Sequence, residues 1–111
     1  MSIDVTYRLA REDELSAMRL IQSKALYDLI VTRGGRPSST IPITDEPSTE
    51  MRHLLKTDPK LAWLALEDDH PVGFSVGFVR GDLWFLSDLF VLPDAYGKGI
   101  GRELLKRCLE G

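Results

Sequence analysis

The chain has 111 residues and a formal net charge of −3, with 43% hydrophobic and 28% charged residues. This composition is ordinary for one globular domain, and its acidic balance disfavours a nucleic-acid-binding protein, whose surface is usually basic. No apolar run approaches the roughly 18 residues of a membrane span, and the first residues lack the form of a signal peptide. We therefore expect a cytoplasmic protein, and its one cysteine, Cys108, excludes an internal disulfide.

The first half of the chain predicts one strand and two helices. Residues 3–9 alternate between apolar and polar side chains, as in a strand. Apolar residues then recur every three to four positions over 12–30, which predicts an amphipathic helix. The glycine-, proline- and serine-rich segment 32–47 predicts a loop, which we expect to be mobile because such long loops are uncommon in compact domains. A second, shorter helix is expected over 48–57.

Three closely spaced apolar runs follow, at 61–67, 72–79 and 83–92. The turns between them are short, which predicts an antiparallel meander of three strands. The run 83–92 is apolar on both faces, which is typical of a buried strand with neighbours on both sides. Pro93 ends this run, because proline cannot donate a hydrogen bond to a sheet.

A glycine-rich turn at 94–101 connects the last strand to a helix predicted over 102–109. Successive backbone N–H groups in such a turn can form a nest for oxyanions, and the positive end of the following helix adds to it. Lys98 and Arg102 add two cations. A diphosphate is therefore the expected ligand. The glycines that can adopt positive φ at little steric cost are Gly97, Gly99 and Gly101.

Two common phosphate-binding motifs do not match this turn. The P-loop spacing is absent from the sequence. The dinucleotide-binding fingerprint would begin at Gly97 and requires glycine where Arg102 stands, followed by an acidic residue about 20 positions later. A nucleotide-phosphate binder is therefore only the third hypothesis.

A third pattern fits better. The run 89–105 reads LFVLPDAYGKGIGRELL, and it resembles the signature segment of the GNAT (GCN5-related N-acetyltransferase) superfamily. The family loop has the form Arg/Gln-x-x-Gly-x-Gly/Ala; Gly99 and Gly101 match its glycines, whereas Tyr96 stands at the Arg/Gln position. The predicted order of strand, two helices, three strands and a helix is also similar to that of the family.

This resemblance implies an α+β (α/β three-layer) fold, in which a mixed, mostly antiparallel sheet is flanked by helices. Residues 1–111 would form a single, partial domain, because the family continues with further strands after the third helix. The tyrosine that often protonates the leaving thiolate lies in that later part. We therefore expect that residues 1–111 lack one wall of the cofactor cleft and also lack this proton donor.

The resemblance also implies a function: transfer of an acetyl group from acetyl-CoA to a primary amine of a small molecule or a protein. The strand backbone at Leu89, Phe90 and Val91 would pair with the pantetheine arm. The turn would hold the pyrophosphate, although a plain glycine-rich turn remains the alternative. The residues expected around the pyrophosphate are Tyr96, Gly97, Lys98, Gly99, Ile100, Gly101 and Arg102.

Asp88 is the one acidic residue inside the last apolar strand. Many GNAT proteins have a carboxylate at or beside this position, so the resemblance implies amine binding, or amine deprotonation through water. The alternative is a structural aspartate that accepts hydrogen bonds from backbone N–H groups at a strand irregularity. Strand alternation places Phe85 and Ser87 on the face opposite Asp88. No histidine, cysteine and carboxylate spacing indicates a metal site.

The strand 83–92 has only one neighbour in the predicted meander. An exposed apolar edge of this kind invites pairing with another chain, so we expect a homo-oligomer, such as a dimer, or complementation by a partner chain. A second functional hypothesis is a non-catalytic module that binds CoA or docks a partner through this edge. The sequence does not identify the acceptor amine.

Overall fold

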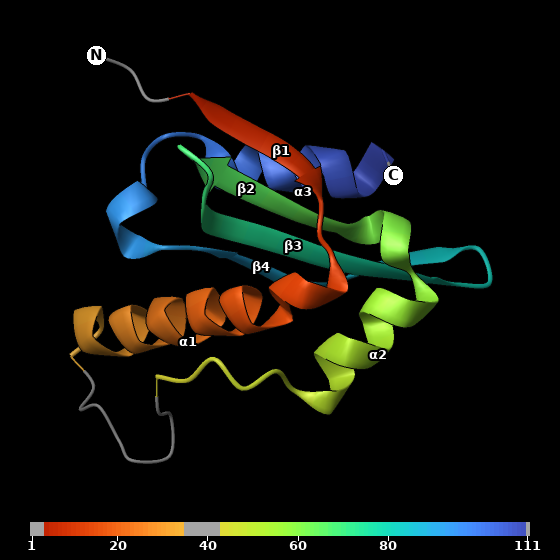
Figure 1. Ribbon diagram of the computed structural model, residues 1–111, viewed down its shortest axis with the longest axis horizontal. Helices are drawn as coiled ribbons and strands as arrows, with labels where there is room; N and C mark the ends of the chain where they lie inside the picture. Colours follow the sequence, from red (N-terminus) through yellow and green to blue (C-terminus); the bar gives the residue numbers. More distant parts are fainter. Residues whose placement is uncertain (1–3, 35–42, 111) are drawn as a thin grey trace.

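The structure of the protein, a computed structural model, describes residues 4–34 and 43–110 (Figure 1). Four strands form one sheet in the order β1-β2-β3-β4, and each neighbouring pair is antiparallel. The strands are β1 (Val5–Leu9), β2 (Ala62–Glu67), β3 (His70–Arg80) and β4 (Leu83–Val91). The helices are α1 (Leu15–Thr32), α2 (Thr49–Thr57) and α3 (Ile100–Glu110). The predicted order of elements is confirmed.

The sheet separates two hydrophobic cores, which gives the predicted three layers. On one face, α1 and α2 cover the core that contains Met18, Leu64 and Phe74. On the other face, α3 covers a second core through Ile100 and Leu104. Because β3 lies between two strands and both of its faces are covered, Val72 to Gly77 are all buried. This is why the two central strands read as nearly continuous apolar runs.

Two element boundaries differ from the sequence prediction. The turn between β2 and β3 consists only of Asp68 and Asp69, whose φ angles are 51° and 65°. Two positive φ angles are typical of a two-residue hairpin turn, so His70 already belongs to β3. The helix α3 begins at Ile100, two residues earlier than predicted.

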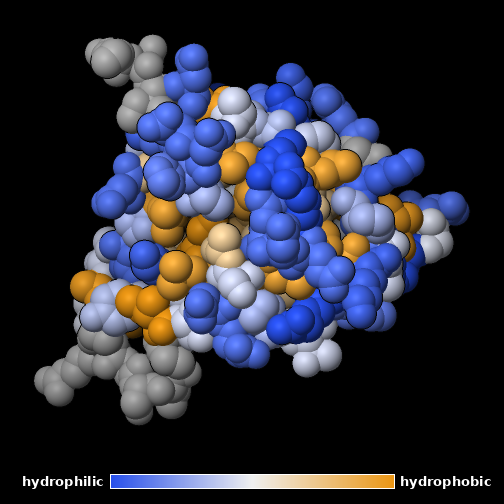
Figure 2. All heavy atoms as spheres, viewed as in Figure 1, coloured by the Kyte–Doolittle hydropathy of each residue, from blue (hydrophilic) through white to orange (hydrophobic). Residues whose placement is uncertain are grey.

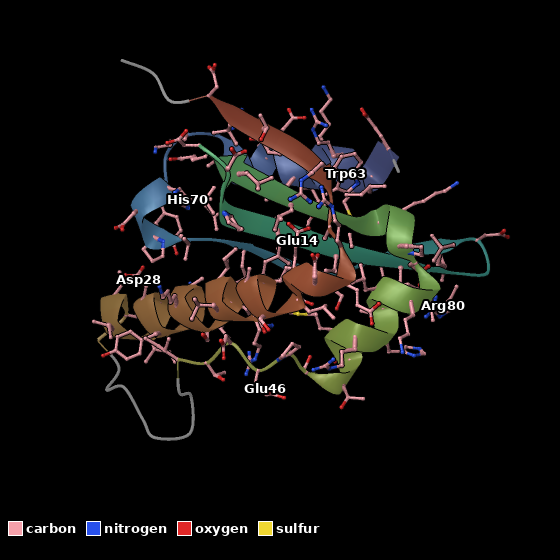
Figure 3. All side chains as sticks on the ribbon, in the orientation of Figure 1. Glu14, Asp28, Glu46, Trp63, His70 and Arg80 are labelled. Carbon is pink, nitrogen blue, oxygen red and sulfur yellow. The ribbon has the colours of Figure 1, made fainter. Side chains whose placement is uncertain are left out.

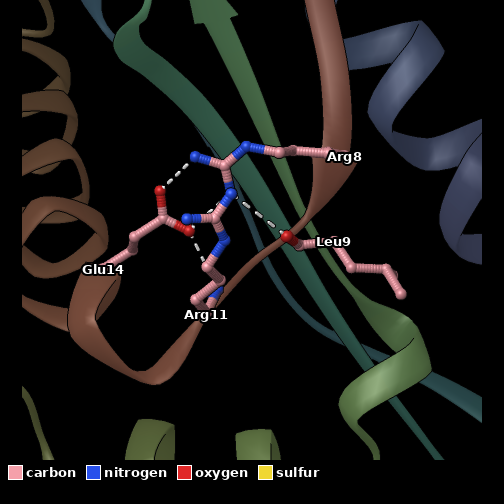
Figure 4. Close-up of polar contacts among 4 residues, drawn as sticks. All are labelled: Arg8, Leu9, Arg11 and Glu14. Carbon is pink, nitrogen blue, oxygen red and sulfur yellow. Dashed lines mark hydrogen bonds and ion pairs between the residues drawn. The ribbon is translucent and has the colours of Figure 1, made fainter.

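The connection from β1 to α1 is fixed by one ion pair (Figure 4). The Arg8 guanidinium donates to Glu14 Oε1 at 2.7 Å and also contacts the second carboxylate oxygen. The Arg11 N–H donates to the same Oε1 at 2.9 Å, within the short 3₁₀ turn η1 (Glu12–Glu14). This pairing lowers the pKa of Glu14. It also joins the end of β1 to the turn that leads into α1.

β4 is an edge strand of the described sheet, with β3 as its one neighbour there, as the predicted meander implied. Leu83, Phe85 and Leu86 are 63%, 41% and 40% exposed. The expectation of an exposed apolar edge is therefore confirmed for the described part of the chain. The predicted mobility of loop 32–47 concerns mainly residues 35–42, which lie outside the described residues, as does the first residue of the predicted strand 3–9.

Candidate functional site

A pocket of about 480 Å³ opens between α1, the second half of β4 and the glycine turn. Eight of the ten residues predicted to bind a cofactor line it, and Lys98 and Arg102 are the two that do not. Figure 2 shows hydrophobic side chains gathered near the C-terminal end of α1, where Leu29 forms part of the pocket wall. The lining residues are Ala25, Leu29, Leu89, Phe90, Val91, Ala95, Tyr96, Gly97, Gly99, Ile100 and Gly101.

The turn depends on two glycines. Gly97 and Gly99 have φ angles of 82° and 76°, in the left-handed region that favours glycine. A Cβ atom at either position would meet no other atom within 4 Å, so both face open space. Gly101 differs from the prediction, because it lies in the first turn of α3 without a positive φ. A Cβ there would lie 3.9 Å from Val91 Cγ2, an ordinary contact.

The N-terminus of α3 points its first backbone N–H groups toward this turn. The first N–H groups of a helix lack a carbonyl partner inside the helix and carry the positive end of its dipole. The Glu103 N–H donates to the Gly99 carbonyl at 3.1 Å, and this hydrogen bond links the first turn of α3 to the glycine turn. Ile100 is buried and anchors this end of the helix in the core under α3. The arrangement suits an anion bound beside Gly97 and Gly99.

The charged and aromatic side chains of the turn are placed differently from one another. Lys98 Nζ lies 2.9 Å from Glu67 Oε1 at the end of β2, and Arg102 is exposed on α3. Tyr96 stands at the pocket rim, 53% exposed. Burial and the carboxylate of Asp28, which Figure 3 labels near the end of α1, raise the pKa of Tyr96. The Tyr96 phenol therefore stays protonated and can donate a hydrogen bond.

Asp88 lies at an irregularity in the pairing of β3 and β4. Asp88 pairs with Val76 and Leu86 pairs with Gly77, so Ser87 is an extra residue that forms a β-bulge. The bulge brings Ser87 Oγ to 3.1 Å from Asp88 Oδ2, and the expectation that these side chains face apart is wrong. The predicted irregularity is present.

The hydrogen-bond partners of Asp88 are side chains. Gln22 Nε2 donates to Asp88 Oδ1 at 3.1 Å, and Ser87 donates to the other oxygen. The alternative of a structural aspartate required hydrogen bonds from backbone N–H groups to this carboxylate. Among the described residues, the donors to it are side chains instead. Burial is the main cause that raises the pKa of Asp88, and the nearby Glu50 carboxylate raises it further. An aspartate of raised pKa on the strand that lines the pocket is a candidate general base.

Sequence reasoning did not identify Arg19, Gln22 and Glu50 as parts of this site. Arg19 and Gln22 lie on α1 and Glu50 lies in the first turn of α2. Each is separated from Asp88 by many residues along the chain and has no local motif. Only the packing of α1 against β3 and β4, and of α2 against β3, brings them together.

Within residues 4–34 and 43–110, no group of three or more His, Cys, Asp or Glu side chains could hold a metal ion. Among the same residues, no helix is long and apolar enough to cross a membrane. The candidate site consists of an apolar pocket, a glycine turn at the N-terminus of α3 and, on β4, the carboxylate of Asp88.

A sheet whose last strand leads through a glycine turn into a helix, with an acid on that strand, is the arrangement that the acetyltransferase resemblance implied. The chain belongs to the acetyltransferase (GNAT) family, whose family model matches residues 24–110. The family expected from the sequence is thereby confirmed. No curated protein matches the sequence.

Three solved structures illustrate the similarity in fold. A PaiA N-acetyltransferase from Thermoplasma acidophilum in complex with coenzyme A has a TM-score of 0.76 at 16% identity; the match covers 97% of this chain and 71% of that one. A GNAT family acetyltransferase from Brucella melitensis in complex with acetyl-CoA has a TM-score of 0.64 at 20% identity, with 98% and 68% covered.

The third structure is a protein from Pyrococcus horikoshii assigned as an acetyltransferase, with a TM-score of 0.71 at 23% identity. The match covers 96% of this chain but only 34% of that one. The chain thus spans between a third and about seven tenths of these three proteins. Two of them contain CoA or acetyl-CoA, in agreement with the cofactor expected from the sequence.

Proposed function

We propose that this chain binds acetyl-CoA and forms the acetyl-transfer site of an N-acetyltransferase that acts on primary amines of a small molecule or a protein. The observation that carries the proposal is the pocket along β4, which ends at the turn of Gly97 and Gly99. Eight residues predicted from the sequence as cofactor ligands meet in it. Membership of the acetyltransferase family supports the same reaction.

The residues present fit such a cofactor. The N–H groups of the glycine turn and of the first turn of α3 would bind the pyrophosphate. The free edge of β4 at Leu89, Phe90 and Val91 would pair with the amide groups of the pantetheine arm, as one strand pairs with another. When bound, acetyl-CoA supplies the activated acetyl group. Tyr96 would donate to an oxygen of the ligand at the pocket rim.

Asp88 would prepare the acceptor. An ammonium group has no free electron pair, so a protonated amine must lose a proton before its nitrogen can attack the acetyl carbonyl. The Asp88 carboxylate has a raised pKa and would take up this proton, directly or through one water molecule. A cytoplasmic location, expected from the sequence, is part of the same proposal.

A non-catalytic CoA-binding or partner-docking module is the second candidate. The exposed edge of β4, with Leu83, Phe85 and Leu86 at its surface, favours it. CoA binding without acetyl turnover in a screen of amines would support this second candidate over the first.

The cofactor proposal is tested by thermal unfolding of the chain with acetyl-CoA, CoA, ATP and NAD in parallel. A ligand that binds only the folded state adds about 2.7 kcal/mol of stability at about 100 times its Kd. For a domain of about 100 residues this raises Tm by roughly 10 °C. We expect this increase with the two CoA compounds alone. Equal increases with ATP or NAD, or none with CoA, would contradict the proposal.

Self-association through β4 is a further part of the proposal, because an uncovered apolar edge favours pairing with a second copy. Light scattering over a range of protein concentrations should show a dimer or larger species. Leu86→Lys, which places a charge on this edge where Leu86 is 40% exposed, should shift the chain toward the monomer. A monomer at the highest concentration would contradict this prediction.

A further inference from the structure

We propose that Gln22 is a positioning residue for Asp88: its amide holds one carboxylate oxygen in place without neutralising the charge, and Arg19 fixes the orientation of that amide. The inference rests on the proposed function, in which Asp88 accepts a proton from the acceptor amine. It concerns two residues of α1 that neither the sequence motif nor the family resemblance assigns to the site.

The contacts form a chain from α1 to β4. Arg19 Nη1 donates to Gln22 Oε1 at 2.6 Å, and Gln22 Nε2 donates to Asp88 Oδ1 at 3.1 Å. A guanidinium can only donate hydrogen bonds, so it selects the oxygen of the Gln22 amide. The NH₂ group of Gln22 must then face Asp88. Arg19 thus determines, through Gln22, that an N–H donor faces Asp88.

Arg19, the first residue in this series of hydrogen bonds, is itself held by a further contact. Arg19 Nε donates to the main-chain carbonyl of Glu46, in the segment that precedes α2, at 3.2 Å. Met18 and Ile21, which flank these side chains on α1, are buried against the sheet at 0% and 3% exposure. The backbone that carries Arg19 and Gln22 is therefore anchored in the core, on the side of the sheet that α1 covers.

The hydrogen bonds leave Asp88 able to bind a further donor. Gln22 occupies one site on Oδ1 and Ser87 one site on Oδ2. A carboxylate offers about four acceptor sites, so each oxygen can still accept a hydrogen bond from an ammonium group or a water molecule. The carboxylate is held in one orientation and remains accessible to a proton.

A neutral residue at position 22 is important for this role. A lysine or arginine there would form an ion pair with Asp88, favour the ionised form and weaken it as a base. The charged groups that face Asp88 are Arg19 from α1 and Glu50 from α2, whereas β3 places the uncharged Val76 opposite it. These two charges act in opposite directions on the Asp88 carboxyl. Gln22 adds direction but no charge.

The test compares Gln22→Met, Gln22→Lys and the exposed-site control Ser16→Ala in the full chain. The titration midpoint of Asp88 is measured by ¹³C NMR of the carboxyl carbon, without any acetyl transfer. Loss of a hydrogen bond to the ionised form should raise the midpoint in Gln22→Met, and an added cation should lower it in Gln22→Lys. Ser16→Ala should leave it unchanged. An Asp88 midpoint that is the same in all variants would overturn the proposal.

Rates are measured in parallel with an amine that the wild-type chain acetylates. Gln22→Met should lower kcat about tenfold, the loss expected for a hydrogen bond to a charged group, with the KM for acetyl-CoA unchanged. In an Asp88→Asn background the same change should cost nothing further. An equal loss in both backgrounds would reveal a general structural effect and overturn the positioning role. A wild-type chain without any transfer would contradict the proposed function, while the NMR titration would still decide whether Gln22 controls Asp88.

Discussion

Asp88→Asn is expected to lower the rate of acetyl transfer by about 10²- to 10⁴-fold, the usual range for a general base, while the affinity for acetyl-CoA stays nearly unchanged. Asparagine has a similar shape and can keep the hydrogen bond from Ser87, but it cannot take up a proton. Steady-state kinetics with a primary amine, together with calorimetric titration of CoA, would measure the two quantities separately. An unaltered rate would remove Asp88 from the mechanism.

The pH dependence of the same enzyme provides a second test. Because the pKa of Asp88 is raised, chiefly by burial, its carboxyl should stay protonated at pH values where an ordinary aspartate is ionised. The acid limb of the kcat/KM profile should therefore lie above the ordinary aspartate range in the wild-type chain and should disappear in Asp88→Asn. An acid limb that persists in the variant would assign it to another group.

Asp88→Asn should lower the catalytic rate but should not lower the stability of the fold. A carboxyl whose pKa is raised in the folded state binds its proton more tightly there. The folded protein therefore loses this contribution to its stability as the pH rises through that pKa. Removing this ionisation should leave the free energy of unfolding at neutral pH unchanged or higher. A loss of activity in Asp88→Asn would then be chemical, because the variant stays folded.

Gly99→Val is expected to abolish CoA binding, with a loss of at least about 100-fold in affinity. Gly99 has a φ of 76°, and a β-branched residue in this region costs roughly 1–3 kcal/mol. Its side chain would also fill the open space beside the turn, where a Cβ meets no atom within 4 Å. An anion would then lose several hydrogen bonds from backbone N–H groups, and a hydrogen bond to a charged group is worth about 1.5–3 kcal/mol. Calorimetric titration with CoA measures the loss.

Gly81→Val is the matched control. Gly81 has a φ of 65° and no atom within 4 Å of a Cβ, but it lies in the turn between β3 and β4 and does not line the pocket. The two variants should lose similar stability, and only Gly99→Val should lose CoA. Gly101→Ala, which introduces an ordinary contact with Val91, should fold normally. Equal affinities in Gly99→Val and Gly81→Val would contradict the assignment of the turn.

The sequence was sufficient where the determining interactions are local. The hydrophobic pattern located the four strands and three helices of the described residues, because each must bury apolar side chains in one of the two cores. The glycine spacing identified the turn for which we propose anion binding, since Gly97 and Gly99 adopt backbone angles that other residues avoid. The apolar run around Leu83–Val91 correctly indicated a strand whose free edge would remain uncovered.

Only the tertiary structure decided which side chains meet. The hydrogen bond from Gln22 to Asp88 joins residues 66 positions apart. It depends on the packing of α1 across β4, and on the β-bulge that turns Ser87 toward Asp88. Likewise, Lys98 is drawn to Glu67 at the end of β2 and away from the pocket. Local patterns specify backbone conformation, whereas the partners of a polar side chain are set by the long-range packing that determines which groups lie within hydrogen-bond distance.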